Sequence, residues 1–229
     1  MPDIDKPDDP DYLGHRKRLR ARFLQAPDAL PDYELLEMLL GFVIPRQDTK
    51  PRAKQLLKDF GSLGDLLSAD ARRLTDHGLS ETIVAMLKAV HAGGLRLARA
   101  ETRKRDALSS WDAVLAYCTA AMAYNPVEEF RVLYLDRKNG VIADEAQQKG
   151  TVDHTPVYPR EVVKRALELS ASALILVHNH PSGDPKPSQA DIAMTREVQD
   201  ACSKLGLLLH DHVVIGRGSN ASFRSLGLL

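Results

Sequence analysis

The sequence contains very little cysteine. Cys118 and Cys202 are the only two among 229 residues. Two cysteines exclude a disulfide-rich framework and a zinc site built from four thiolates. If the chain binds a metal ion, histidine and carboxylate side chains must therefore supply most of the ligands.

The sequence also lacks an excess of either charge. Lys and Arg total 31, and Asp and Glu total 31, so the formal net charge is zero at pH 7. This balance excludes a strongly basic coat for nucleic acid over the whole chain.

Long apolar runs are missing as well, since none approaches the roughly 18–20 residues that cross a bilayer. The N-terminal stretch MPDIDKPDDPDYLG is acidic and rich in proline, and it has no apolar signal core. We therefore expect a disordered lead-in over residues 1–12, no association with membranes, and a cytoplasmic location.

Two patterns of apolar residues divide the remaining chain. Over residues 13–100 the pattern is helical, as in DYELLEMLLGFVI. The polar stretch ARAETRKRDALSS, residues 98–110, contains the expected boundary. Strand-like runs such as EEFRVLYLD and ALILVHNH then alternate with helical segments. The patterns predict a small all-α domain over 13–100 and an α/β domain with a mixed sheet over 106–229.

Two features of the N-terminal domain are compatible with phosphate binding. Five cations lie between Arg16 and Arg22, and the turn DHGLSE, residues 76–81, would expose backbone N–H groups at the start of a helix. A solvated helix face and an ordinary connection between helices explain the same features. Spacing alone favours this simpler interpretation, but a DNA contact through the N-terminal domain remains an alternative.

The segment HNHPSGDPKPSQAD, residues 178–191, is the most informative part of the chain. His178 and His180 lie two apart at the end of a predicted strand, so both imidazoles point to one side and Asn179 points away. Asp191 lies in the first turn of the next predicted helix, where its carboxylate can reach back. Two imidazoles and a carboxylate suit a zinc ion and leave a fourth tetrahedral position for water.

Each of these residues also has a simpler interpretation. Ser188 and Asp191 have the spacing of a capping box, and an acidic residue in the first helical turn interacts favourably with the helix dipole. The two histidines could be hydrogen-bonded polar residues at a strand end. The metal interpretation gains weight because three potential ligands converge where a sheet ends, which is where sites form in α/β domains.

This segment resembles the JAMM (MPN+) metalloprotease motif. With KGTVDHTPVYPREVVKRAL before it and LHDHVVIG after it, the chain resembles the RadC branch of that family over about residues 106–229. Through FGSLGDLLSAD, the N-terminal part is similar to the helix-hairpin-helix-type domain of RadC proteins. The resemblance implies a mixed-sheet MPN (JAMM) domain that uses zinc, with His178, His180 and Asp191 as the zinc ligands.

The resemblance also implies roles for a serine and a glutamate. Ser188 matches the serine that hydrogen-bonds the water or the oxyanion. The family's general acid/base is an upstream glutamate, for which Glu128 and Glu129 are both candidates, and the arrangement Glu128-Glu129-Phe130 favours Glu128. Because adjacent strand residues face opposite sides, only one of the two can reach the site. Alternatively, both are solvent-facing charges at the start of a strand.

Further residues are candidates for supporting the ligands or lining a cleft: Asn179, His154, Arg160, Asp211 and His212. In the stretch HDH, an Asp or His could orient a ligand imidazole, and a second metal cluster is the less favoured alternative. Arg160 could bind a carboxylate or phosphate of the substrate, or could form only a surface ion pair.

Together these features predict a zinc-dependent hydrolase of the JAMM type that cleaves an amide or isopeptide bond in a protein or peptide substrate. The alternative is a DNA-binding or DNA-processing protein whose MPN domain acts on nucleic acid or serves as a scaffold. The letters HNH also name a class of nuclease, but in that class the three residues lie far apart in the chain, so the spelling is no evidence.

Overall fold

The computed structural model describes residues 11–104, 107, 110–149 and 157–229. The chain divides into two compact units, Met1–His91 and Ala92–Leu229. The first helix begins at Asp11, so it includes the last two residues of the predicted lead-in over 1–12, and the preceding residues lie outside the described part. Helix α6 runs through residue 98 without interruption, so no break in the helix marks the start of the domain boundary expected at residues 98–110. That boundary stays a prediction.

The first unit is helical, as the spacing of apolar residues predicted. Its core is formed mainly by leucines, together with other aliphatic residues and Phe60. Phe60 is followed by Gly61, which ends the helix with a φ of 97°. The predicted turn at residues 76–81 lies between two helices, with Gly78 at a φ of 73°. The elements are α1 (Asp11–Gln25), η1 (Pro27–Ala29), α2 (Asp32–Val43), α3 (Lys50–Phe60), α4 (Leu63–Ser68), α5 (Ala71–Asp76) and α6 (Glu81–Lys104), whose residues from Ala92 on belong to the second unit.

The second unit is built on a five-stranded mixed sheet in the order β2-β1-β3-β4-β5. The pair β3 and β4 is parallel and the other neighbouring pairs are antiparallel. Strands β1 and β2 form a hairpin whose turn contains Asn139-Gly140, a pair typical of such turns, and Asn139 has a φ of 59°. The strands are β1 (Glu129–Leu135), β2 (Val141–Lys149), β3 (Ala173–Asn179), β4 (Leu208–Ile215) and β5 (Asn220–Ser222).

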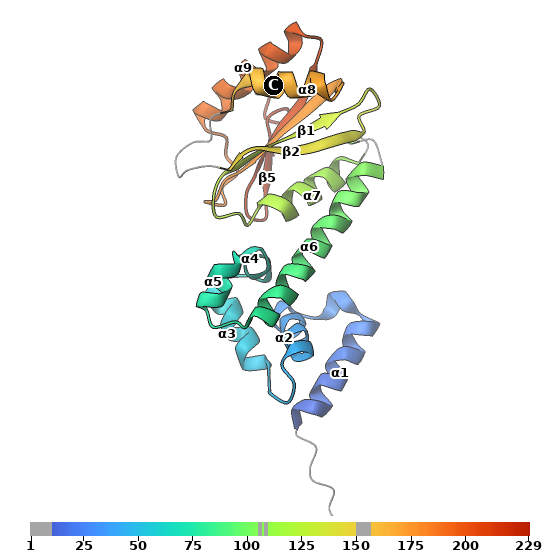
Figure 1. Cartoon of the computed structure of the whole chain (residues 1–229), viewed down its shortest axis with the longest axis vertical. Helices are drawn as coiled ribbons and strands as arrows, with labels where there is room; N and C mark the ends of the chain where they lie inside the picture. The colour runs from blue at the N-terminus through green and yellow to red at the C-terminus, as the bar shows by residue number, and fades with distance from the viewer. Residues whose placement is uncertain (1–10, 105–106, 108–109, 150–156) are drawn as a thin grey trace, which may run out of the picture. The chain divides into compact units, whose positions relative to one another are not determined.

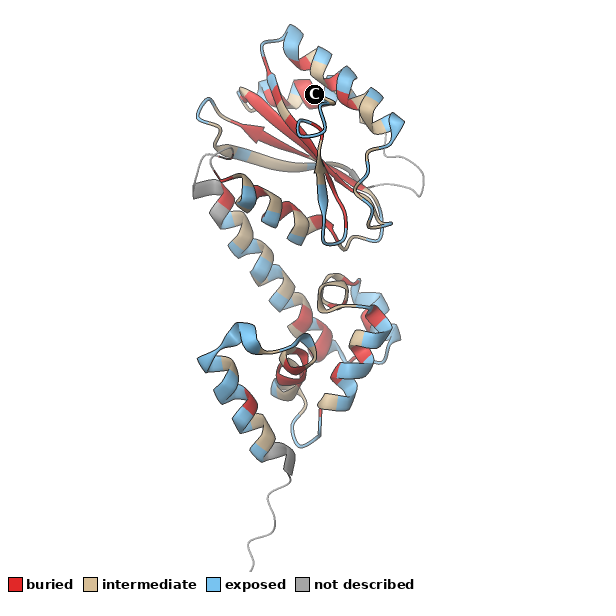
Figure 2. Cartoon of the chain, turned by 180° about the vertical axis from the view of Figure 1, so that it is seen from behind, coloured by how far each residue is buried: buried red, intermediate tan, exposed pale blue. Residues whose placement is uncertain are grey.

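Helices cover both faces of this sheet. Helix α7 (Trp111–Met122) packs on one face, and α8 (Pro159–Glu168) and α9 (Gln189–Lys204) pack on the other (Figure 1). The central strand β3 is buried along its whole length, which explains its nearly continuous apolar sequence (Figure 2). Alternate residues of β3 therefore belong to two different cores: Ile175 and Val177 face α7, whereas Leu174 and Leu176 face α8 and α9.

The connection after β3 returns the chain sharply toward α9. Gly183 has a φ of 90°, and its carbonyl oxygen accepts a hydrogen bond from the Arg217 N–H at 3.1 Å. A side chain at Gly216 is excluded, because its Cβ would come 2.3 Å from the Gly183 oxygen. The His180 N–H donates to the Ile215 carbonyl at 2.9 Å. These contacts fix the start of the connection against the end of β4.

Two expectations about composition can be compared with the fold. Cys118 and Cys202 are both buried and carry free thiols, in agreement with the absence of a disulfide framework. In the described ranges, none of the helices combines the length and the apolarity needed to cross a bilayer.

Candidate metal centre

The two histidines of the HNH stretch lie side by side at the end of β3. His178 is 1% exposed and His180 follows the last strand residue. Strand alternation directs both side chains to the same side, and their Nε2 atoms are 3.0 Å apart. The Nδ1 atom of His180 lies 2.8 Å from the Asp184 carbonyl oxygen, to which it can donate. This bond leaves the His180 Nε2 atom to face the site.

Asp191 lies across from this pair in the first turn of α9. Its Oδ1 is 3.5 Å from the His178 Nε2, and its Oδ2 is 3.6 Å from the His180 Nε2. The same carboxylate completes a capping box with Ser188, whose N–H and hydroxyl both donate to Oδ2 at 2.7 Å. The capping and ligand interpretations of Asp191 are therefore compatible, because the cap aims the carboxylate at the histidines.

The spacing of these three groups fits a single metal ion. Their ligand atoms lie within 4.8 Å of one another. Two ligands held about 2.0–2.1 Å from a tetrahedral zinc ion are separated from each other by about 3.3 Å. The two Nε2 atoms are 3.0 Å apart, and each faces a different oxygen of Asp191, at 3.5 Å for His178 and 3.6 Å for His180, so all three distances are close to that value. The donor set of two nitrogens and one carboxylate oxygen also matches the preference of zinc.

Charges at the site favour an ionised carboxylate. Burial acts to raise the pKa of Asp191, but the nearby imidazoles of His178 and His180 outweigh it and hold the pKa well below its ordinary value. The Asp191 carboxylate in turn raises the pKa of His180, with smaller contributions from the Asp184 carbonyl and the charge of Glu128. A metal ion at this point would replace the protons on the imidazoles, so its binding would depend on pH.

A buried chain of hydrogen bonds supports His178 from behind. Its Nδ1 lies 2.7 Å from the His212 Nε2, and the His212 Nδ1 lies 2.6 Å from the Thr195 hydroxyl oxygen. The Thr195 hydroxyl donates to the Asp191 carbonyl at 2.5 Å. Because Thr195 must donate there, His212 donates to Thr195 and accepts from the Nδ1–H of His178. When a metal ion takes the place of the proton on the His178 Nε2, this direction keeps the remaining proton of His178 on Nδ1 and leaves the Nε2 lone pair for the metal.

The surroundings of this chain keep His212 neutral. Complete burial and the neighbouring His178 lower the pKa of His212 well below its ordinary value. The Phe223 ring stacks on His212 at 4.4 Å between centroids, and the Phe130 ring lies 5.6 Å from it, edge to face. Phe130 also stacks against His178 at 6.1 Å. These two aromatic rings thus exclude water from the hydrogen bond between His178 and His212.

The two candidate glutamates face different sides of the sheet. Phe130 is paired with His178 in the antiparallel register of β1 and β3, so continuation of that register brings Glu128 opposite His180. Glu128 is partly exposed, and no hydrogen bond to its carboxylate is present within the described residues. Glu129 is buried on the other face, where its carboxylate accepts from Arg131 at 2.8 Å.

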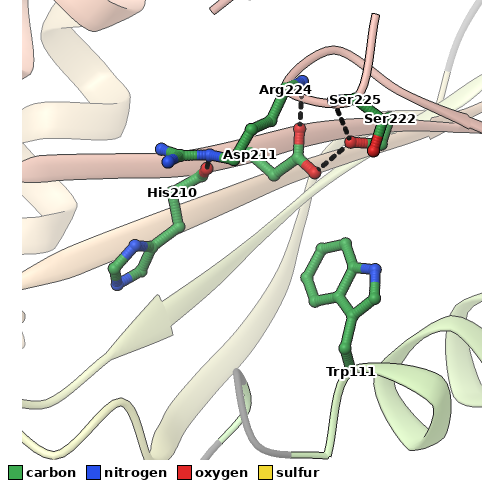
Figure 3. Close-up of a pocket in the computed structure, with 6 residues that line it drawn as sticks. All are labelled: Trp111, His210, Asp211, Ser222, Arg224 and Ser225. Carbon is green, nitrogen blue, oxygen red and sulfur yellow. Dashed lines mark hydrogen bonds between the residues drawn. The ribbon is translucent and has the colours of Figure 1, made fainter.

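Asp211, another candidate, lies on the opposite side of the sheet from His178 and His180. Asp211 points to the α7 side and lines a separate pocket with Trp111, where it accepts bonds from the Ser222 hydroxyl and the Arg224 N–H (Figure 3). Strand alternation gives Asp211 this orientation, since its neighbour His212 points to the side of the sheet where His178 and His180 lie. Asp211 therefore binds the end of β5 and the residues that follow it, and it does not orient the imidazole of His178 or His180.

The position of Arg160 does not match the role in lining a cleft that was considered for it. Its side chain is 82% exposed and pairs with Glu161, one residue further along α8, at 3.1 Å. It lies 5.8 Å from the Tyr158 ring. The structure thus favours the surface ion pair. His154 lies outside the described residues.

Thr195 and Phe223 were not identified from the sequence. Thr195 lies four residues after Asp191 on α9, so helical spacing alone could have placed it on the same face. For Phe223 no local signal exists, because its ring meets His212 only where the chain after β4 turns back along that strand.

Comparison with known proteins agrees with the predicted resemblance. Residues 108–228 match the RadC-like JAB domain family. A UPF0758 protein of Rhodobacter capsulatus is 62% identical over 213 residues, which cover 92% of this chain and 100% of that protein. A UPF0758 protein of Ruegeria pomeroyi is 57% identical over 223 residues, or 96% of this chain and 100% of that protein. The chain therefore belongs to the RadC family, with a RadC-like JAB domain that contains the three converging side chains that could hold a metal ion.

Proposed function

We propose that the protein is a zinc-dependent hydrolase that cleaves an amide or isopeptide bond in a protein or peptide substrate. The observation that carries this proposal is the convergence of His178, His180 and Asp191 at spacings that suit one zinc ion. The side chains of His180 and Asp191 are 18% and 13% exposed, so the site is accessible from that side. Bound Zn²⁺ would supply a Lewis acid that lowers the pKa of water from 15.7 to about 7.

Glu128 is the proposed general acid/base. It would take a proton from the attacking water and deliver it to the leaving amine. Its position supports this role, because it comes opposite His180 and its charge contributes to the raised pKa of that residue. Glu129 is the weaker candidate, since Arg131 and Asn125 already bind its carboxylate at 2.8 and 3.2 Å.

Ser188 has two proposed tasks. Its N–H and hydroxyl hold the Asp191 carboxylate in place. The hydroxyl would also stabilise the oxyanion of the transition state, which requires it to turn away from Asp191. The backbone N–H of Ser188 would continue to hold the carboxylate during that turn.

Metal analysis combined with a cleavage assay tests this function. The probes are fluorogenic peptides, Lys-ε-isopeptide-linked peptides, and single- and double-stranded DNA. Zinc-loaded wild-type protein should cleave a peptide or isopeptide, and Glu128→Gln should bind zinc equally but lose at least about 100-fold in rate. Glu129→Gln is the matched control and should retain most of the activity. Full activity of Glu128→Gln, or cleavage of DNA alone, would contradict the proposal.

The N-terminal unit gives only limited support for the DNA alternative. Arg16 donates to the carbonyls of Gly41 and Ile44 at 3.2 and 2.9 Å, and Arg22 pairs with Glu34 at 3.0 Å. Two of the five cations therefore serve the packing of α1 on α2. A salt titration of binding to duplex DNA provides the test, because affinity for phosphates falls steeply with salt.

A further inference from the structure

Asn179, the residue between the two histidines, binds the segment that leads into β1. Its side chain is fully buried and lies on the opposite side of the strand from the imidazoles. The Oδ1 atom accepts a hydrogen bond from the Glu129 N–H at 2.8 Å. The Nδ2 atom donates to the carbonyls of Val127 and Asn125 at 3.1 and 3.4 Å.

These bonds hold the backbone on both sides of Glu128. One is made by the residue before it and one by the residue after it, so the position of the Glu128 Cα is fixed relative to β3. Only a side chain that both accepts and donates can make this set, and the carboxamide of asparagine does so at the required length. The side chains of Asn125 and Arg131 hold Glu129 on the same face, so the Glu128 side chain is directed to the other side.

We propose that Asn179 is a positioning residue that sets the distance between the Glu128 carboxylate and the metal centre. The inference rests on the proposed function, in which Glu128 moves the proton. Because Asn179 lies between His178 and His180, a single strand end would fix both the metal ligands and the acid/base group. Pre-organisation of this kind matters, since small displacements of a catalytic group cost large factors in rate.

The test measures the position of Glu128 without a substrate. The protein is loaded with Co²⁺, a paramagnetic substitute for zinc, and the broadening of the ¹³C signal of the Glu128 carboxylate carbon is recorded. In Asn179→Ala this broadening should fall severalfold, because the carboxylate moves away from the metal. Asn179→Asp keeps the acceptor for the Glu129 N–H and should keep more of the broadening than Asn179→Ala does.

Asn139→Gly is the matched control. The Asn139 amide makes a 2.8 Å bond to His210 at the other end of β1, and its φ of 59° suits glycine. Both Asn179→Ala and Asn139→Gly should lower the melting temperature, but only Asn179→Ala should change the Glu128 signal. A merely structural role for Asn179 predicts the same small change of that signal in both variants.

The outcomes distinguish a failure of the proposed function from a failure of the positioning role of Asn179. If wild-type protein does not bind Co²⁺, the proposed function fails and this inference fails with it. If Co²⁺ binds and the Glu128 broadening is the same in wild type, Asn179→Ala and Asn179→Asp, only the positioning role is refuted. Should Asn179→Ala not fold, the comparison of Asn179→Asp with wild type decides: reduced broadening supports the role and unchanged broadening refutes it.

Discussion

Removal of the imidazole behind His178 should weaken metal binding without touching a ligand. His212→Ala deletes a side chain that is completely buried and leaves the Nδ1–H of His178 without its acceptor at 2.7 Å. Groups that orient a metal-bound imidazole typically contribute about 10–100-fold to metal affinity. We therefore expect the Kd for Zn²⁺ to rise by that factor, which corresponds to about 1.4–2.7 kcal/mol.

Two further variants refine this expectation. Thr195→Val keeps the shape of the side chain but removes the acceptor for the His212 Nδ1–H at 2.6 Å. It acts one step further from the metal, so its effect should be smaller than that of His212→Ala. His210→Ala removes a histidine from the same strand that bonds to Asn139 at 2.8 Å, and it should leave zinc affinity unchanged.

The assay is a competition titration with a chromophoric chelator, combined with a melting curve for each metal-free variant. The melting curve is needed because His212 also packs on Phe223, so its removal destabilises the fold. Zinc affinity within twofold of wild type in folded His212→Ala would refute the role assigned to the chain from His178 to Thr195.

Three other predictions concern the fold and its charges. Burial raises the pKa of the Cys118 thiol to about 12 and that of the Cys202 thiol to about 11. Iodoacetamide at about pH 8 should therefore label neither thiol until the protein is unfolded. Rapid labelling of the native protein, measured by mass spectrometry, would count against the described core. Gly216→Ala should lower both the melting temperature and the zinc content, because the new Cβ meets the Gly183 oxygen. An unchanged melting temperature and zinc content would show that the connection after β3 shifts without destabilising the fold or the site. The raised pKa of His180 stabilises metal-free protein below about pH 6.5, and this contribution is lost as pH rises through the raised pKa. The melting temperature of metal-free wild type should therefore fall more than that of His180→Ala between about pH 6 and about pH 9, and parallel curves would contradict the assignment.

Local patterns predicted the parts of the site that depend on local geometry. A period of two placed His178 and His180 on one side of a strand end, and the capping spacing placed Asp191 in the first turn of a helix. The mixed sheet and the helical first unit followed from the change in apolar spacing along the chain. The family resemblance, and not the spacing, singled out Glu128.

Contacts between distant segments could not be predicted in this way. Whether Asp211 or His212 faces the ligands depends on the register of β4 against β3, which is shifted by an irregularity at Leu174 and Ile175. The pairing of Asn179 with Glu129 spans 50 residues. Such contacts depend on how strands align in the folded sheet, and the local sequence does not encode that alignment.

The central claim is that His178, His180 and Asp191 bind one zinc ion together. A crystal structure of zinc-loaded protein, with anomalous data at the zinc edge, tests this most directly. We predict one peak per chain at about 2.0–2.2 Å from the Nε2 atoms of both histidines and a carboxylate oxygen of Asp191. A peak bound by other residues, or no peak at this position in zinc-soaked crystals, would contradict the account.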